Sequence, residues 1–260
     1  MTNRIAKAFE GGKAFIAFLT GGDPSIEKTE EFIVEMEKAG ADIIEIGIPF
    51  SDPIAEGPVI QAANIRALNA GAGIDKIFCM VERLRQTGAS QVPLVFLTYL
   101  NPVFRYGYAA FFKRCAGAGV DGVIIPDLPF EEQAEVKAAA RAESIALISL
   151  IAPTSAGRIS KIAGAADGFL YIVSSMGVTG VRNEIKTDIP SIAAAARPYA
   201  KVPLAVGFGI NTPHQAAEIA RYADGVIVGS AIVKIIAEHG YAAAPRIAEY
   251  VTAMKKALKH

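Results

Sequence analysis

Eight short apolar runs recur along the chain, and each is followed by a segment of helical length. The runs are rich in β-branched residues, which favour extended strands. They lie at 14–20, 42–48, 93–99, 122–127, 146–152, 168–174, 202–208 and 225–230. Stretches between them, such as 26–40, 129–143 and 212–223, have the apolar spacing of amphipathic helices and are bounded by capping residues. Strands that alternate with helices predict a parallel sheet.

Eight such units fit a closed (β/α)₈ barrel, which typically takes about 250 residues. The alternative is an open, doubly wound sheet, which would carry a GxGxxG turn after its first strand. Here that turn reads TGGDPS at 20–25 and does not match. No linker or low-complexity segment divides the chain. The sequence therefore predicts one α/β domain over 1–260, a single TIM barrel with extra helices at the N-terminus and after strands 2 and 8.

Glu45 interrupts the isoleucine-rich second run. In an extended chain Ile44 and Ile46 point to one face, whereas Ile43 and Glu45 point to the other. If the Ile44 face packs against the outer helices, the Glu45 face meets the barrel lumen. The prediction is a carboxyl group inside the barrel near the carboxyl ends of the strands, where barrel enzymes place their chemistry.

Composition narrows the classes of partner. The chain has 260 residues, of which 52% are hydrophobic and 20% charged, so it can bury a large core. Lys and Arg together number 26, as do Asp and Glu, so no net charge attracts nucleic acid or an anionic membrane. Neither a signal-peptide core nor a membrane-spanning run is apparent. We expect a cytoplasmic protein whose partner is a small molecule or another protein.

The cysteines and histidines suggest no special chemistry. Cys79 and Cys115 match neither a disulfide framework nor a zinc spacing, and are interpreted as packing residues. His214, His239 and His260 do not cluster, so no metal site and no cofactor is expected.

Glycine-bearing loops follow the last three strands, at 177–182, 207–212 and 229–234. Glycines let backbone N–H groups approach an anion, and the segment from Ser230 is predicted to begin a short helix whose N-terminus favours a phosphate. Tight turns without a ligand are the alternative. Three such loops on adjacent strands favour the usual phosphate site of this fold.

Carboxylates are the remaining candidates for catalysis. Schiff-base chemistry needs a lysine at the carboxyl end of a strand, but Lys13 and Lys201 precede their strands. Near the predicted strand ends lie Asp23, Glu45, Asp52, Glu56 and Asp127. Glu45 is the most interior, and apolar walls should raise its pKa and suit it to acid–base work. The alternatives are a Glu45 held by a buried cation or Tyr171, a solvated Glu56, and turn-capping roles for Asp52 and Asp127.

Seven segments, in the same order, resemble those of the tryptophan synthase α subunit family. The most specific is IEIGIPFSDPIAEGP at 44–58, and the others lie at 15–24, 99–104, 126–132, 174–180, 206–210 and 228–234. The resemblance covers nearly the whole chain. It implies a lyase that cleaves indole-3-glycerol phosphate by a retro-aldol reaction into indole and glyceraldehyde 3-phosphate. Indole would pass to a pyridoxal-phosphate β subunit in an α2β2 complex.

The resemblance also implies roles for individual residues. Glu45 matches the catalytic glutamate that protonates the indole carbon and relays the hydroxyl proton, and Glu56 matches the acid at the indole N–H. The residues implied to bind substrate are Phe18, Ile60, Tyr171, Thr179, Gly180, Phe208, Gly209, Gly229 and Ser230. Those implied to face the β subunit are Asp52, Asn101, Pro102 and Val103.

Two positions depart from the family pattern. Glu56 replaces the commoner aspartate and is longer by one methylene group, and Ser175 replaces an arginine found in part of the family. Three alternative functions stay open at this point. The first is another phosphate-binding barrel of the same pathway, although the strand-end lysine or the cysteine and aspartate pair expected of such an enzyme is missing. The second is a stand-alone indole-releasing lyase. The third is a catalytically silent subunit that binds the phosphorylated ligand and regulates a partner.

Overall fold

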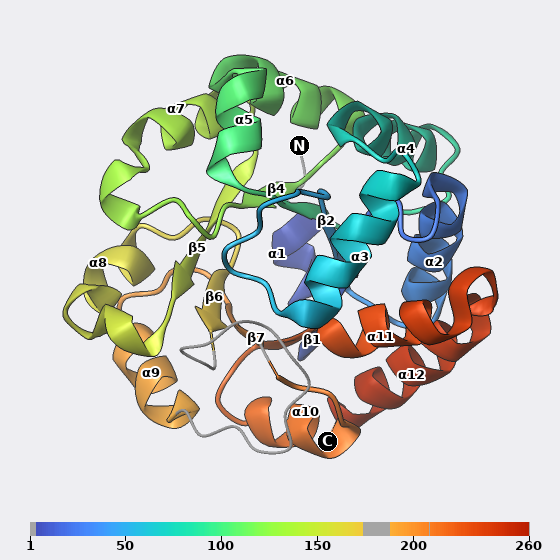
Figure 1. Ribbon diagram of the computed structural model, residues 1–260. Helices are drawn as coiled ribbons and strands as arrows, with labels where there is room; N and C mark the ends of the chain where they lie inside the picture. The colour runs from blue at the N-terminus through green and yellow to red at the C-terminus, as the bar shows by residue number, and fades with distance from the viewer. Residues whose placement is uncertain (1–3, 174–187, 208, 260) are drawn as a thin grey trace.

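Eight parallel strands close into a barrel in the computed structural model, which describes residues 4–173, 188–207 and 209–259 (Figure 1). The strands follow one another around the barrel in chain order, and β8 pairs with β1. They are β1 Ala14–Thr20, β2 Ile43–Gly47, β3 Leu94–Leu97, β4 Gly122–Ile124, β5 Ala146–Ile151, β6 Leu170–Val173, β7 Leu204–Gly207 and β8 Gly225–Val228. The predicted (β/α)₈ barrel is confirmed.

Helices surround the barrel. They are α1 Arg4–Ala8, α2 Ile26–Lys38, α3 Pro58–Asn69, α4 Ile74–Gln86, α5 Leu100–Tyr106, α6 Tyr108–Ala118, α7 Ala134–Ala142, α8 Ile159–Gly164, α9 Ile189–Ala196, α10 Pro213–Ile219, α11 Ser230–His239 and α12 Ala244–Ala257. Short 3₁₀ helices lie at η1 Phe130–Glu132, η2 Pro153–Arg158 and η3 Gly240–Ala242. Beyond one helix per strand, α1 precedes β1, α3 and α4 both follow β2, and α11 and α12 both follow β8. Both α5 and α6 follow β3, and the extra helix there was not predicted.

Capping residues fix where several of these helices begin. Ser25 accepts a hydrogen bond from the backbone N–H of Lys28 at the start of α2. Thr212 and Gln215 form a reciprocal capping box at the start of α10. Both caps supply hydrogen-bond acceptors to backbone N–H groups that have no partner within the first helical turn, as the sequence pattern predicts.

Strand alternation divides the apolar core into two layers. Ile44, Ile46 and Ile48 belong to the outer layer, between strands and helices. Ile43 belongs to the lumen layer, together with residues such as Ile16 and Tyr171. One side of β2 therefore faces the helices and the other faces the lumen, as predicted, because successive side chains of a strand point to opposite faces.

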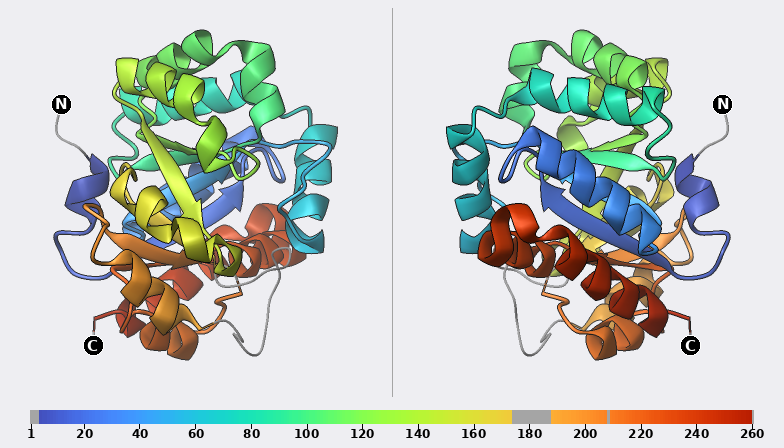
Figure 2. Two further views of the ribbon diagram at one scale, coloured as in Figure 1. Left: turned by 90° about the vertical axis from the view of Figure 1, so that its left-hand side faces the viewer. Right: turned by 90° about the vertical axis from the view of Figure 1, so that its right-hand side faces the viewer.

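The two ends of the barrel are closed differently. At one end Ile5 of α1 packs into the lumen layer, and at the other lies α3 (Figure 2). At the α3 end, Phe18 packs with Ile60 and Val233 of α3 and α11. In the described ranges no helix is both long and apolar enough to cross a membrane.

One of the two cysteines is placed differently from the prediction. Cys115 is buried in the outer core layer, as expected of a packing residue, but Cys79 is exposed. The helical spacing of α4 places Cys79 on the solvent-exposed face of the helix, next to the Arg114 guanidinium.

Candidate active site

Glu45 lies on β2 with its side chain in the barrel lumen. Its Cα is in register with Phe18 of β1 on one side and with Val95 of β3 on the other. The residue is only 1% exposed. The lumen position expected from the alternation of apolar and polar residues in β2 is therefore confirmed.

Burial controls the protonation of Glu45. Its Oε1 atom has no hydrogen-bond partner among the described residues. Loss of hydration raises the pKa of the carboxyl from 4.5 to about 8, because the charged form is disfavoured away from water. The group is therefore mostly protonated at neutral pH, yet its pKa is close enough to neutrality for it to donate and then take back a proton.

Glu56 lies in the loop between β2 and α3. Gly57 and Pro58 follow it directly and begin α3, because proline is favoured in the first turn of a helix. Glu56 is 6% exposed, so the alternative of a solvated loop acid is excluded. Its Oε2 accepts a hydrogen bond of 2.6 Å from Nδ2 of Asn64, which lies about two turns into α3.

Two opposing effects set the protonation of Glu56. Burial raises the pKa of its carboxyl to about 7, against the lowering effect of hydrogen bonds from Asn64 and Tyr99. Tyr99 in turn accepts a hydrogen bond of 3.2 Å from the backbone N–H of Ala55. Glu56 therefore has the lower pKa of the two glutamates, and there is a pH range in which Glu56 is ionised while Glu45 is protonated.

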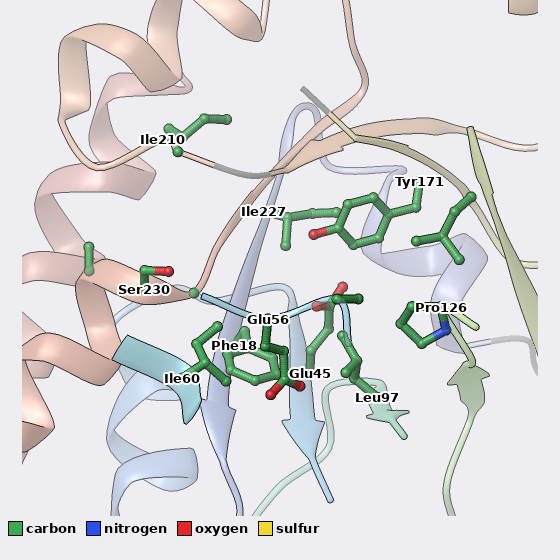
Figure 3. Close-up of a pocket in the computed structure, with 15 residues that line it drawn as sticks. Phe18, Glu45, Glu56, Ile60, Leu97, Pro126, Tyr171, Ile210, Ile227 and Ser230 are labelled. Atoms are coloured by element: carbon green, nitrogen blue, oxygen red, sulfur yellow. The ribbon is translucent and has the colours of Figure 1, made fainter. Parts of the chain in front are cut away.

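The two glutamates line one cavity at the carboxyl ends of the strands (Figure 3). The space between its walls is about 670 Å³ when the open mouth is included. The lining residues are Phe18, Glu45, Ala55, Glu56, Ile60, Leu97, Pro126, Leu150, Tyr171, Gly209, Ile210, Ile227, Gly229, Ser230 and Ala231. None of these described lining residues is a lysine, arginine or histidine. A buried cation that holds Glu45 is thus absent from the described lining.

Two aromatic rings form opposite walls of the cavity. Phe18 lies beside Ile60, and Tyr171 lies beside Ile227 (Figure 3). A Cβ atom on Gly229 would lie 3.1 Å from Phe18 Cδ1, and one on Gly207 would lie 2.3 Å from the Tyr171 hydroxyl. A side chain at Gly207 would therefore displace the Tyr171 ring, and one at Gly229 would require Phe18 to shift slightly. Burial and the Glu45 carboxyl raise the pKa of Tyr171 well above its usual value, so this phenol keeps its proton.

The described parts of the glycine loops reach the same cavity. Gly209 has a φ of +83°, a backbone conformation in the left-handed region that favours glycine. Ser230 begins α11, as predicted, and lines the cavity with Gly229 and Ala231. The N-terminus of a ten-residue helix, with its free N–H groups, thus faces the space that the glutamates share.

All the predicted binding residues that the structure describes lie together. Phe18, Ile60, Tyr171, Gly209, Gly229 and Ser230 all line the cavity. Thr179, Gly180, Phe208 and Ser175 lie outside the described residues. Leu97, Leu150 and Ile227 were not predicted, although period-2 alternation along their strands placed them on the lumen side.

The other carboxylates near the strand ends have structural partners. Asp23 is 1% exposed and forms a bidentate ion pair with Arg66 of α3, at 2.9 and 2.7 Å. Asp127 accepts a hydrogen bond from the backbone N–H of Leu100. Asp52 is exposed, and its Oδ2 accepts a 2.5 Å hydrogen bond from Ser51. None of these three carboxylates lines the cavity.

The expected partner surface needs one correction. Val103 is fully buried in the outer core, so its side chain cannot contact a partner as predicted. The reason is that 100–106 is the helix α5, whose spacing turns Val103 inward. Asn101 is exposed and Pro102 partly so, and the exposed apolar side chains here are Phe104, at 66%, and Ile54, at 72%.

The fold and the cavity define a (β/α)₈-barrel protein with a small-molecule site that carries two carboxyl groups of raised pKa. The family model of the tryptophan synthase alpha chain matches residues 5–259. A tryptophan synthase alpha chain of Lacticaseibacillus casei is 48% identical over 258 residues, with 99% of this chain and 96% of that protein covered. One of Thermoanaerobacter sp. is 46% identical over 264 residues, with 98% and 100% covered.

Solved structures agree with these matches. Tryptophan synthase of Mycobacterium tuberculosis is similar with a TM-score of 0.90 and 34% identity, and both chains are covered completely. The tryptophan synthase subunit alpha of Legionella pneumophila is similar with a TM-score of 0.88 and 37% identity, with 99% of each chain covered. The chain belongs to the tryptophan synthase alpha chain family. It is a carbon–carbon lyase of tryptophan biosynthesis that cleaves indole-3-glycerol phosphate.

Proposed function

We propose that Glu45 and Glu56 perform this cleavage as an acid–base pair, with Glu45 protonated and Glu56 ionised in the substrate-free protein. The observation that carries the proposal is that both carboxyl groups line one apolar cavity, with pKa values raised to about 8 and about 7. Retro-aldol chemistry needs a group that donates a proton to carbon and a group that takes one from nitrogen. The indole ring itself accepts the electrons of the broken bond.

In the first step Glu45 donates its proton to the ring carbon that bears the glycerol chain. Glu56 accepts the indole N–H proton, so the ring becomes its non-aromatic tautomer without net change in charge. In the second step ionised Glu45 takes the proton of the adjacent hydroxyl group, and the O–H electrons form the aldehyde carbonyl. The carbon–carbon bond breaks, its electrons restore the aromatic ring, and Glu56 returns the proton to nitrogen. Both glutamates end as they began.

The substrate phosphate would bind at the N-terminus of α11. Gly229 and Ser230 line the cavity there, and Gly209 comes from the neighbouring loop. Backbone N–H groups and the helix dipole would hold the dianion, since no basic side chain is among the described lining residues. The indole ring would lie between the Phe18 and Tyr171 walls, with its N–H toward Glu56.

The protein would act with a β subunit in an α2β2 complex, to which it passes indole. The support is the family membership together with the exposed apolar side chains of Ile54 and Phe104 beside Asp52, Asn101 and Pro102. The Tyr99 hydroxyl joins this side of the molecule to the Glu56 loop through Ala55. A docked partner would thereby favour the productive arrangement of Glu56 without supplying a catalytic group.

The direct assay is indole release from indole-3-glycerol phosphate by the purified chain, with and without a β subunit. We expect release in both cases and a faster rate with the partner. Full speed alone, with no response to the partner and no co-elution with it, would favour the stand-alone lyase. No release even with the partner would indicate a silent binding subunit.

A pair of variants tests the role of Glu56. If its carboxyl receives the N–H proton, Glu56→Ala should reduce turnover far more than Glu56→Asp, which keeps the group at shorter reach. Equal turnover in the two variants would contradict the role.

A further inference from the structure

We infer that Asn64 is a positioning residue for the lyase reaction, which holds the Glu56 carboxylate through its Oε2 atom and so orients it toward the substrate. The inference rests on the proposed role of Glu56. It goes beyond that role by naming the side chain on which the longer acid depends.

The contact is short, buried and local. Asn64 Nδ2 donates to Glu56 Oε2 at 2.6 Å, and Asn64 is 3% exposed. Asn64 lies on the inner face of α3, where its buried neighbours are Ile60, Ala63 and Ala67. A polar side chain on this otherwise apolar face is costly unless it is paired, and the Asn64 amide is paired with Glu56.

Asn64 does not line the cavity, whereas Glu56 does. Asn64 therefore acts on the substrate only through Glu56. The loop that carries Glu56 is held separately, because Gln61 Nε2 donates to the Glu56 backbone carbonyl at 2.7 Å. The two bonds divide the task, since Gln61 fixes the backbone and Asn64 fixes the carboxylate.

A glutamate needs such a contact more than an aspartate does. It has one more rotatable bond, so more side-chain freedom is lost when its carboxylate is held at one place. A hydrogen bond to a defined oxygen selects one arrangement before the substrate binds, which is the condition for efficient proton transfer.

The same contact affects the charge of Glu56. Burial raises the pKa of this carboxyl, and the bond from Asn64 is the larger of the two hydrogen-bond effects that lower it. The other groups that face this carboxyl are neutral or acidic. Tyr99 also hydrogen-bonds it, and Glu45 and Tyr171 line the same cavity. Without the amide, nothing in the described lining replaces the lost stabilisation of the carboxylate.

The test compares Asn64→Leu with Gln61→Leu, which removes the neighbouring bond to the Glu56 backbone. Both are measured as kcat and KM for indole release from indole-3-glycerol phosphate, with the β subunit present, between pH 6 and 9. We expect Asn64→Leu to reduce kcat about tenfold at pH 6.5 and to move the acidic limb to higher pH, with KM nearly unchanged. Gln61→Leu should leave the limb where it is.

A double-mutant cycle separates a positioning role from a general structural one. In a Glu56→Ala background, Asn64→Leu should cause no further loss of kcat, because the group through which it acts is gone. If leucine is too large for the site, Asn64→Ala gives the same comparison. Measurements of unfolding identify variants whose activity is lost only because they are unstable.

An equal loss from Asn64→Leu with and without Glu56, or an unmoved acidic limb in both Asn64 variants, would overturn the inference while leaving the role of Glu56 intact. If Glu56→Ala itself retains full activity, the proposed function of Glu56 fails instead.

Discussion

At the scale of single residues, the active site depends on carboxyl groups kept away from water. Glu45 is 1% exposed, and burial raises its pKa to about 8. Alternation along β2 predicted this placement, because a strand buried on both sides leaves only the lumen for a side chain opposite Ile44 and Ile46. The bond between Asn64 and Glu56 was not predictable, since it depends on how the loop after β2 returns to α3.

The pH dependence of the reaction follows from the two glutamates. The productive form has Glu56 ionised and Glu45 protonated, so kcat/KM for indole release should be bell-shaped, with an acidic limb near pH 7 and a basic limb near pH 8. The second pKa of a phosphate ester is about 6, below both limbs. Steady-state rates between pH 5.5 and 9.5 check this, and a flat profile across that range would contradict it.

Burial of Glu45 should also reduce stability as the pH rises. Its pKa is about 8 in the folded protein and 4.5 in the unfolded chain, so ionisation of the unfolded chain favours unfolding progressively from pH 4.5 to about 8. Glu45→Gln removes this effect. Relative to the unmodified chain, the variant should gain on the order of 3 kcal/mol in free energy of unfolding between pH 5.5 and 8.5. Denaturant titrations at the two pH values measure the gain, and a difference independent of pH would refute it.

At the scale of helices and strands, period-2 and helical patterns predicted the eight-unit order, because each run must bury an apolar face. Strand ends were less predictable. The run 122–127 forms a strand only over Gly122–Ile124, since Pro126 cannot donate a backbone hydrogen bond to the sheet. Helix α5 was not predicted either, because its seven residues are too few to show a helical repeat.

The N-terminus of α11 offers a test of the phosphate site. A carboxylate at position 230 would interact favourably with the helix dipole but would repel a bound phosphate. An amide of the same size would not repel the phosphate. Ser230→Asp should therefore bind glycerol phosphate at least about tenfold more weakly than Ser230→Asn, with no loss of folding stability. Calorimetry on the two variants measures the difference. Equal affinities would return this helix start to a purely structural role.

At the scale of the whole molecule, the two ends of the barrel have different tasks. The amino end is closed by α1 (Figure 2). The carboxyl end carries the cavity and the exposed side chains of Ile54 and Phe104. Sequence patterns indicated the region of the partner surface, but they assigned Val103 to it in place of Phe104. Only the helical turn of α5 decides which of these neighbours faces outward.

The partner surface can be tested by substituting exposed aromatic residues at the two opposite ends of the barrel. Phe104→Ser should weaken binding of a β subunit about tenfold or more, while the partner-free rate stays nearly unchanged. Tyr222 is 44% exposed and lies before β8, at the other end of the barrel, so Tyr222→Ser is the matched control. Size-exclusion chromatography and titration of the rate with β subunit report both. If the two substitutions weaken assembly equally, the partner docks elsewhere.

The most direct test of the account is the rate of indole release from indole-3-glycerol phosphate by Glu45→Gln in a single turnover with the β subunit present. The amide keeps the shape of the side chain but can neither donate nor accept the required proton. The account predicts a loss on the order of 100-fold or more, with glycerol phosphate affinity unchanged. Release at nearly the unmodified rate would contradict the assignment of Glu45 as the acid–base group.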